Sequence, residues 1–230
     1  MNKISVIIPT LNEEDCIGRL LRHLKMNSSK DIIAEFIIVD GGSNDATTEI
    51  VSNIEDTILL YSKKGRAVQM NVGAEHATGN ILYFLHADSF PPMDFDALIA
   101  AEVGKGNPAG CFKMKFDRAH WWLKLASWFT KFHWRACRGG DQSQFITKEL
   151  FEELGCFDER FMVYEDNDLI NKLYARNQFV VIQKWLTTSA RRYSANGIWK
   201  LQYHFWTIYI KKWFGASAEE LHRYYLKNIA

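Results

Sequence analysis

The feature that most constrains this fold is a regular alternation of short apolar runs and amphipathic segments between residues 4 and 88. The first run, residues 4–8, is rich in β-branched side chains and stops at Pro9, as is typical of a buried strand. Further strands are predicted at Phe36–Val39, Thr57–Tyr61 and Ile81–Leu85. Helices are predicted between them at Glu13–Lys25, around Ile50–Ile54 and at Arg66–His76. This alternation favours right-handed βαβ units and an α/β fold with a parallel sheet.

The alternation breaks after about residue 105. We expect an antiparallel strand at Ala109–Phe116 and then an aromatic-rich helix at Ala119–Ala136. The remaining predicted elements are helices at Thr147–Leu154 and Glu165–Arg176, a strand near Phe179–Ile182, and a helical stretch Gly197–Lys227 broken at Gly215. No linker rich in Pro or Ser separates the two halves, so we expect the second half to be fused to the first sheet.

Composition excludes several classes of protein. The chain has 230 residues, of which 47% are hydrophobic, so it is neither disordered nor collagen-like. A net charge of +1 gives no support for a nucleic-acid partner. The four cysteines lack CxxC spacing, which favours free thiols over a structural zinc site. Neither a signal-like N-terminal run nor a window of about 18 apolar residues is present, so we expect a cytoplasmic location.

Polar residues follow four of the predicted strand ends. They are Pro9–Glu13, Asp40–Asp45, Lys63–Arg66 and His86–Asp88. In open α/β sheets, ligands bind outside the carboxyl ends of the strands, and this mixture of carboxylates and cations suits a nucleotide. Asp88 could hold a divalent metal that bridges a diphosphate. The alternative is that Asp40 and Asp45 only form a turn and a helix cap, as Asn12 would before the first helix.

Taken in order, these segments resemble the family 2 glycosyltransferases, which are inverting enzymes with the GT-A fold. The resemblance covers residues 4–170 and is carried by residues 5–13, 37–45, 65–74, 85–88 and the acidic pair Glu165-Asp166. It implies a Rossmann-like, mostly parallel sheet flanked by helices, here with a helical C-terminal extension. The late Q-x-x-R-W motif of processive synthases is replaced by residues 189–193, so the chain most resembles a short, non-processive bacterial subgroup.

The resemblance implies a nucleotide site at the strand ends. Pro9, Asn12 and Glu13 would surround the base and ribose, Asp40 would accept from a base N–H, and Arg66 would lie near the base or the phosphates. Asp88, the last carboxylate of the family's metal motif, would bind Mg²⁺ or Mn²⁺. The first position of that motif is His86, which we interpret as a neutral hydrogen-bonding group, with metal ligation as the alternative. The nucleotide-binding candidates are Pro9, Asn12, Glu13, Asp40, Gly42, Arg66 and His86.

The acidic pair is the predicted catalytic centre. The resemblance assigns Asp166 as the general base that takes the proton of the acceptor hydroxyl, with Glu165 as the second candidate. The structural alternative is that these acids only stabilise a helix N-terminus. Candidates for contact with the sugar or the acceptor are Gly140, Asp141, Gln142, Arg191 and Arg192. The alternatives are that residues 140–142 form a plain loop and that Arg191 and Arg192 are a solvated basic pair.

The second half is unusually aromatic and locally basic. All eight tryptophans follow residue 120, and Trp199, Trp206 and Trp213 share one helix face. Residues 183–218 contain six Lys or Arg and no acid. This pattern is typical of a helix at an anionic lipid surface, and it indicates a lipid-linked acceptor or peripheral attachment to the inner face of the membrane. Packing against the sheet or a second subunit, as in a homodimer, is the alternative.

The sequence therefore predicts a metal-dependent, inverting glycosyltransferase. It would transfer one sugar from a nucleotide-diphosphate sugar, with UDP as the expected nucleotide, to an acceptor hydroxyl. We divide the chain into a nucleotide-binding half (1–105), an acceptor and catalytic half of the same domain (106–195) and an aromatic, basic extension (196–230). The alternative is a non-catalytic protein on this fold that binds a nucleotide sugar or a membrane surface. A nucleotidyltransferase is disfavoured because residues 10–14 lack the glycine-rich basic loop of that class.

Overall fold

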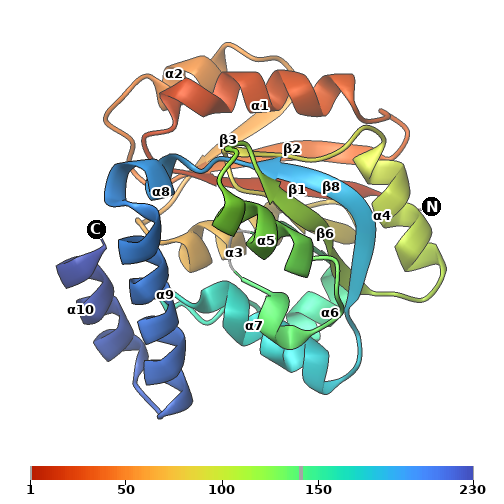
Figure 1. Cartoon of the computed structure of the whole chain (residues 1–230). Helices are drawn as coiled ribbons and strands as arrows, with labels where there is room; N and C mark the ends of the chain where they lie inside the picture. Colours follow the sequence, from red (N-terminus) through yellow and green to blue (C-terminus); the bar gives the residue numbers. More distant parts are fainter. Residues whose placement is uncertain (1, 140–141, 230) are drawn as a thin grey trace.

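One eight-stranded sheet runs through the molecule, in the order β3-β2-β1-β4-β7-β6-β8-β5. The computed structural model describes residues 2–139 and 142–229 (Figure 1). The strands are β1 (Ile4–Thr10), β2 (Ile33–Asp40), β3 (Thr57–Tyr61), β4 (Ile81–Phe84), β5 (Ser89–Phe90), β6 (Ala109–Phe116), β7 (Gln144–Thr147) and β8 (Val180–Thr188). The first four pair in parallel as predicted, and β7 lies antiparallel to both β4 and β6. The sheet is therefore parallel in its first half and mixed in its second.

Helices cover both faces of this sheet (Figure 1). They are α1 (Glu14–Met26), α2 (Thr47–Ser52), α3 (Arg66–His76), α4 (Phe95–Gly104), α5 (Trp121–Phe129), α6 (Lys148–Glu153), α7 (Glu165–Ala175), α8 (Arg191–Asn196), α9 (Ile198–Trp213) and α10 (Ala218–Asn228). A short 3-10 turn, η1 (Arg135–Cys137), follows α5. Helices α1, α2 and α4 bury their apolar residues on one face, and α3, α6 and α7 bury theirs on the other.

Strand β1 lies at the centre of both cores because side chains alternate between the faces of a sheet. Val6 and Ile8 pack beneath α1, whereas Ile7 packs beneath α3, and all three are fully buried. The parallel register pairs Thr10 with Asp40 and Ile7 with Phe84. The carboxyl ends of β1, β2 and β4 therefore meet at one edge of the sheet.

In the second half, one sequence expectation was met in part and another was wrong. Strand β6 is antiparallel to β7, as expected, but parallel to its other neighbour β8. Helix α5 ends at Phe129 rather than near residue 136. The cause is Thr130, whose hydroxyl accepts a hydrogen bond from Met114 N at 2.9 Å and lies 2.7 Å from Ser127 O. The chain is thus held against β6 at Thr130 and turns away from the helix axis.

The C-terminal stretch is helical and broken at Gly215, as predicted, because this glycine has a φ of +89°. Helices α8 to α10 form a third apolar cluster, in which Leu201, Ile208 and Leu221 pack near Leu123 of α5. Within residues 2–139 and 142–229, no helix combines the length and the apolar character that crossing a bilayer would need.

A close approach between α3 and β1 is the basis of our first prediction. A Cβ atom on Gly73 would lie 2.4 Å from Cγ2 of Ile7, which is fully buried. We expect Gly73→Ala to destabilise the protein by about 1–3 kcal/mol, the usual effect of overpacking a core, although alanine is the better helix former. The measurement is urea unfolding followed by circular dichroism.

Gly104→Ala is the matched control, since Gly104 also lies in a helix and no atom stands within 4 Å of the position that its Cβ would take. We expect it to be neutral or to stabilise the protein by up to about 1 kcal/mol. Equal effects of the two substitutions would contradict the close approach.

Candidate functional site

The loop after β2 is organised by Asp40, which is 1% exposed. One carboxylate oxygen of Asp40 accepts from the backbone N–H of Gly42 at 2.8 Å and of Ser43 at 2.9 Å. The other oxygen accepts from the Ser43 hydroxyl at 2.5 Å. These hydrogen bonds are the ones expected if Asp40 forms a turn. The turn leaves Gly42 exposed at the edge of the sheet, with a φ of +95°. Contact between Asp40 and a nucleotide base stays a prediction.

The loop after β1 is joined to the loop after β2. Asn12 has a left-handed backbone (φ +55°), its side-chain oxygen accepts from Asn44 N, and its own N–H donates to Ser43 Oγ, both at 2.9 Å. The expectation that Asn12 caps α1 was wrong, because Glu13 occupies the cap position and Asn12 is bonded across to the neighbouring loop. Pro9 lies inside β1, opposite Val39.

Glu13 lies at the centre of a charged group at this edge. Both oxygens of its carboxylate lie 2.5 Å from Nη2 of Arg191, which belongs to α8. Burial raises the pKa of Glu13 even though the Arg191 guanidinium opposes the shift. Asp88 raises this pKa further and His86 lowers it, so both lie within electrostatic reach of Glu13. Three sequence candidates from the loops after β1 and β4 are thus brought together with Arg191 from the second half.

Asp88 offers a carboxylate for a divalent cation. It is half-buried just past β4, and its backbone oxygen accepts from Ser189 N at 3.2 Å. Among the residues that the structure describes, no three His, Cys, Asp or Glu side chains are grouped as a complete metal site. A single carboxylate near a charged edge fits Mg²⁺ or Mn²⁺, since Mg²⁺ is usually held by one or two carboxylates together with substrate phosphates and water.

The acidic pair lies at the start of α7 and faces Arg66 of α3. Nη2 of Arg66 is 2.6 Å from Oε1 of Glu165 and 3.7 Å from Oδ2 of Asp166. Glu165 is fully buried, and neither of its oxygens accepts a hydrogen bond of normal geometry from the described residues. Burial raises the pKa of Glu165, and the Arg66 cation only partly offsets this. Glu165, a predicted catalytic residue, and Arg66, a predicted nucleotide-binding residue, are therefore direct partners.

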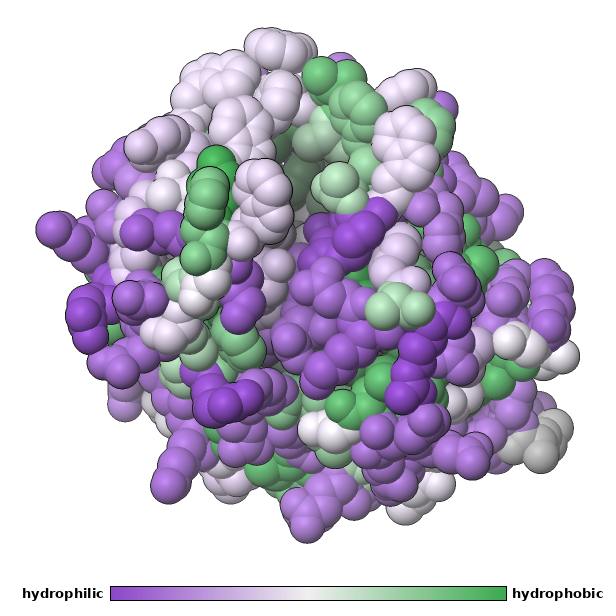
Figure 2. Space-filling view, turned by 90° about the horizontal axis from the view of Figure 1, so that it is seen from below, coloured by the Kyte–Doolittle hydropathy of each residue, from purple (hydrophilic) through white to green (hydrophobic). Residues whose placement is uncertain are grey.

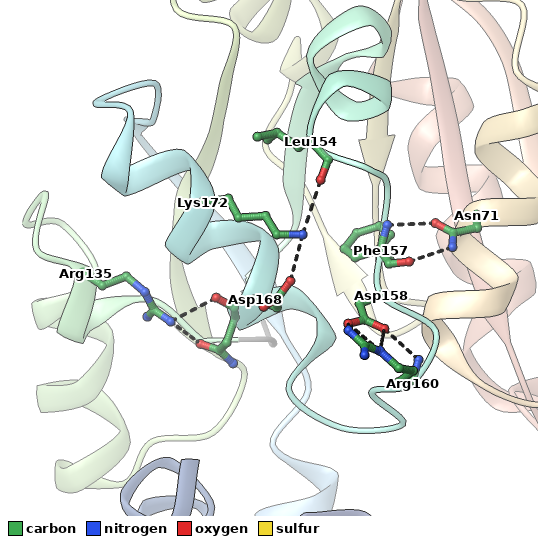
Figure 3. Close-up of polar contacts among 9 residues, drawn as sticks. Asn71, Arg135, Leu154, Phe157, Asp158, Arg160, Asp168 and Lys172 are labelled. Carbon is green, nitrogen blue, oxygen red and sulfur yellow. Dashed lines mark hydrogen bonds and ion pairs between the residues drawn. The ribbon is translucent and has the colours of Figure 1, made fainter. Parts of the chain in front are cut away.

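Helix α7 is fixed from several sides (Figure 3). Arg135 donates to the backbone and side-chain oxygens of Asn167 at 3.3 and 3.1 Å. Lys172 pairs with Asp168 on the same helix at 3.0 Å and donates to Leu154 O at 3.3 Å, which ties α7 to the end of α6. Tyr164, just before the helix, has a φ of +83°, which is rare for a bulky residue and is typical of functional sites. The acidic pair is therefore held in a defined orientation at the helix start.

The predicted acceptor residues fall into different places. Gly140 and Asp141 lie outside the described residues. The Gln142 amide is buried, accepts from Nη1 of Arg138 at 2.8 Å and donates to Cys137 O at 3.0 Å. Its amide therefore fixes the loop that it belongs to.

The two predicted arginines of α8 differ in their partners. Arg191 pairs with Glu13, whereas Arg192 donates to the Tyr225 hydroxyl on α10 and stacks near the Phe205 ring. Arg192 thus holds the C-terminal helices together, and only Arg191 meets the nucleotide candidates.

Sequence reasoning missed two residues beside the acidic pair. They are Arg135 and Tyr209, to which the sequence patterns assigned no role. The Tyr209 hydroxyl lies 3.4 Å from Nδ2 of Asn167, and its ring packs 5.7 Å from that of Tyr164. The one available signal was the position of Tyr209 on α9, about 60° around the helix from the centre of the face that Trp199, Trp206 and Trp213 share.

Comparison with known proteins identifies the family to which this chain belongs. A model described as "Glycosyl transferase family 2" matches residues 5–165. A "PGL/p-HBAD biosynthesis glycosyltransferase" of Mycobacterium bovis (strain BCG / Pasteur 1173P2) is 30% identical over 175 residues, which is 71% of this chain and 66% of that protein. An "Undecaprenyl-phosphate 4-deoxy-4-formamido-L-arabinose transferase" of Proteus mirabilis (strain HI4320) is 35% identical over 114 residues, 45% of this chain and 35% of the relative.

Solved structures show the same fold. The S. aureus TarS 1-349 structure in complex with UDP has a TM-score of 0.65 at 21% identity, over 82% of this chain and 60% of that one. The complex of the same protein with UDP-GlcNAc has a TM-score of 0.62 at 21% identity, over 81% and 58%. The predicted fold, an open sheet flanked by helices as in the GT-A glycosyltransferases, is confirmed. This chain is shorter than these relatives and spans roughly two thirds of their length or less.

The Arg66–Glu165 pair gives a prediction about stability and pH. Burial holds the pKa of Glu165 above its ordinary 4.5, so the folded protein binds this proton more tightly than the unfolded chain. Stability is thus lost as pH rises through the raised value. Arg66→Gln removes the offsetting cation and raises this pKa further. We expect a loss of about 3 kcal/mol at pH 8, at the lower end for a broken buried pair since Arg66 is 36% exposed.

At pH 5 a larger fraction of Glu165 is protonated than at pH 8, which relieves the buried charge, so the loss should be smaller. Urea unfolding at both pH values measures the difference. The control is Arg176→Gln, which breaks an exposed pair with Glu153 and should change stability by less than about 1 kcal/mol at either pH. A loss for Arg66→Gln that does not grow with pH would refute the proposed coupling.

Proposed function

We propose that this chain, which belongs to the family 2 glycosyltransferases, transfers one sugar from a nucleotide-diphosphate sugar to an acceptor hydroxyl with inversion. The observation that carries the proposal is that two groups of charged side chains lie at the same edge of the sheet. The loops after β1, β2 and β4 supply Glu13, Asp40 and Asp88, and α7 presents its acidic pair to Arg66, which follows β3. A donor with a diphosphate and an acceptor hydroxyl need these two kinds of group side by side.

UDP is the proposed nucleotide of the donor. TarS, whose structure is similar, binds UDP and UDP-GlcNAc, which supports a uridine donor here. Asn12 and Glu13 would border the base and ribose together with Pro9. Asp40 would accept from the base N–H through the one lone pair of Oδ1 that its turn leaves available. Arg191 would exchange Glu13 for the diphosphate, because a phosphate group is a stronger partner for a guanidinium than a carboxylate that is already half-buried.

Asp88 would hold Mg²⁺ or Mn²⁺, with His86 beside it as a hydrogen-bonding group. When bound, the cation would neutralise charge that develops on the leaving diphosphate. The protein's own part is to present the Asp88 carboxylate at the rim of the sheet, next to Glu13 and Arg191, where a diphosphate completes the set of oxygen ligands.

Asp166 is the proposed general base, and Glu165 its positioning partner. Glu165 is fully buried and only 2.6 Å from Arg66, so its charge is already engaged, whereas Asp166 retains 6% exposure. Asp166 would accept the acceptor's hydroxyl proton while that oxygen forms its bond to the anomeric carbon and the bond from that carbon to the diphosphate breaks. Gln142, with its neighbours in the sequence, would border the acceptor.

A lipid-linked acceptor fits the aromatic, basic helices of the second half. The Proteus relative carries an undecaprenyl-phosphate sugar transferase name, which supports an acceptor of this kind and peripheral attachment to the inner face of the membrane. Transfer of a single sugar follows from the replacement of the processive motif at residues 189–193. A non-catalytic protein that only binds a nucleotide sugar is the competing function, because His86 departs from the family's metal motif.

Asp166→Asn should separate these two functions. The substitution keeps the shape of the side chain but removes the proton acceptor, so we expect sugar transfer or slow donor hydrolysis to fall about 10²–10⁴-fold. Binding of UDP, measured by calorimetry, should change little. Glu165→Gln is the matched control on the same helical turn, and it should retain far more turnover.

The opposite ranking of these two variants would assign the base to Glu165. Normal turnover in both would show that the acidic pair is structural. UDP binding by the natural protein without any turnover of UDP-sugars would favour the binding protein.

Asp88→Ala should remove the metal dependence of nucleotide binding while the fold survives, because Asp88 is half-buried and outside both large cores. We expect UDP to bind the natural protein more tightly with Mn²⁺ than with EDTA, and the variant to bind equally under both conditions. Calorimetry measures the two affinities, and circular dichroism checks the fold. A variant that keeps the full Mn²⁺ effect would remove Asp88 from the metal site.

A further inference from the structure

Helices α5 and α9 join into one aromatic surface. The Trp122 ring lies 5.2 Å from that of Trp199 and 5.9 Å from that of Trp206. The Trp121 ring lies 5.8 Å from Trp199, and Nε1 of Trp122 donates to Gln202 at 3.2 Å. Two helices that are about 80 residues apart in the sequence therefore share a single surface. We define this α5–α9 surface by the exposed side chains Trp121, Trp128, Trp199, Tyr203, Trp206 and Trp213.

The surface is exposed on the side that faces away from the protein. On α9 the residues at 199, 203, 206, 210 and 213 follow the helical repeat, whereas Leu201 and Ile208 are buried on the opposite side. Trp213 is 84% exposed, and Phe214 beside it is 80% exposed. A contiguous group of large apolar side chains left in solvent marks a binding surface.

Charge indicates what the surface binds. Neither α5 nor α9 contains Asp or Glu, and their exposed lysines are Lys124, Lys200 and Lys211. On α9, Lys200 and Lys211 lie about 100–120° around the helix from the aromatic stripe, as expected for cations that flank an apolar face. A second copy of this chain that docked symmetrically here would bring these lysines together without partners. Anionic lipid, in contrast, supplies the complementary charge.

The surface lies next to the candidate catalytic residues. Tyr209, also on α9, has its hydroxyl 3.4 Å from Asn167, which follows Asp166 in the chain. Helix α8, which carries Arg191, leads directly into α9. Figure 2 shows pale side chains around a hollow near its upper edge, in the view of the molecule from below. Helix α9 thus contributes to this surface and also approaches α7 through Tyr209.

We propose that the α5–α9 surface is a membrane-binding face, which inserts its aromatic side chains into the headgroup region of an anionic membrane. The proposal rests on the function proposed above in one respect, since membrane binding would bring a lipid-linked acceptor to the side of the protein where α9 approaches α7. Tryptophan and tyrosine suit this depth of a bilayer because their rings are amphipathic.

Vesicle sedimentation tests the proposal with the full chain. Vesicles of phosphatidylcholine with 30% phosphatidylglycerol are compared with vesicles of phosphatidylcholine alone, at low and high salt. We expect binding to the anionic vesicles that weakens with salt. The double variant Trp213→Ser/Phe214→Ser should lose most of this binding, and Lys200→Gln should weaken it about fivefold at low salt, the effect of one cation near an anionic surface.

The control is Met26→Ser/Met93→Ser, which removes two apolar side chains of similar exposure far from α5 and α9 and should leave vesicle binding unchanged. Hydrolysis of UDP-sugar in the absence of lipid is measured for every variant, so a failure of the proposed catalysis is distinguished from a failure of membrane binding. No sedimentation with anionic vesicles, or equal sedimentation of all variants, would overturn the proposal. A dimer in solution that Trp213→Ser/Phe214→Ser abolishes would also overturn it, because a second copy would then cover this surface.

Discussion

The ion pair between Arg66 and Glu165 is the interaction on which the site depends. Arg66 starts α3 in the parallel half of the sheet, and Glu165 starts α7 in the mixed half, so the pair joins the two halves where their functional residues meet. Glu165 is fully buried, and a buried carboxylate without a cation would strongly destabilise the fold. The site therefore places a charged pair beside Asp166 at a cost to stability, as is common where the protein must hold reactive groups in position.

The C-terminal extension completes this edge of the sheet. Arg191 pairs with Glu13 across 178 residues of sequence, and Tyr209 approaches Asn167 beside the acidic pair. Helices α8 and α9 thus border the site on their inner side, and α9 contributes to the α5–α9 surface on its outer side. In our account these two helices connect the diphosphate-binding edge to the lipid that carries the acceptor.

The sequence predicted local elements well where the hydrophobic period was clear. Strand Thr57–Tyr61 and helix Arg66–His76 have the predicted bounds, because one run is apolar and the other begins after a glycine and stops before Ala77, whose backbone is extended. Strand β7 was missed because its four residues, Gln144–Thr147, are too few to show a period. The sequence predicted that the site lies at the strand ends, but it did not predict which of the site residues pair with one another. Whether Arg66 would meet Glu165, 99 residues later, depends on tertiary packing that local patterns do not contain.

The central claim is that a uridine diphosphate donor and a divalent cation bind at the carboxyl ends of β1, β2 and β4. The most direct measurement is anomalous diffraction from crystals of the full chain grown with UDP and MnCl₂. Our account predicts a manganese peak within coordination distance of the Asp88 carboxylate and of both phosphates, with the uracil near Asp40. UDP bound at another surface, or manganese bound at this edge without contact to Asp88, would contradict it.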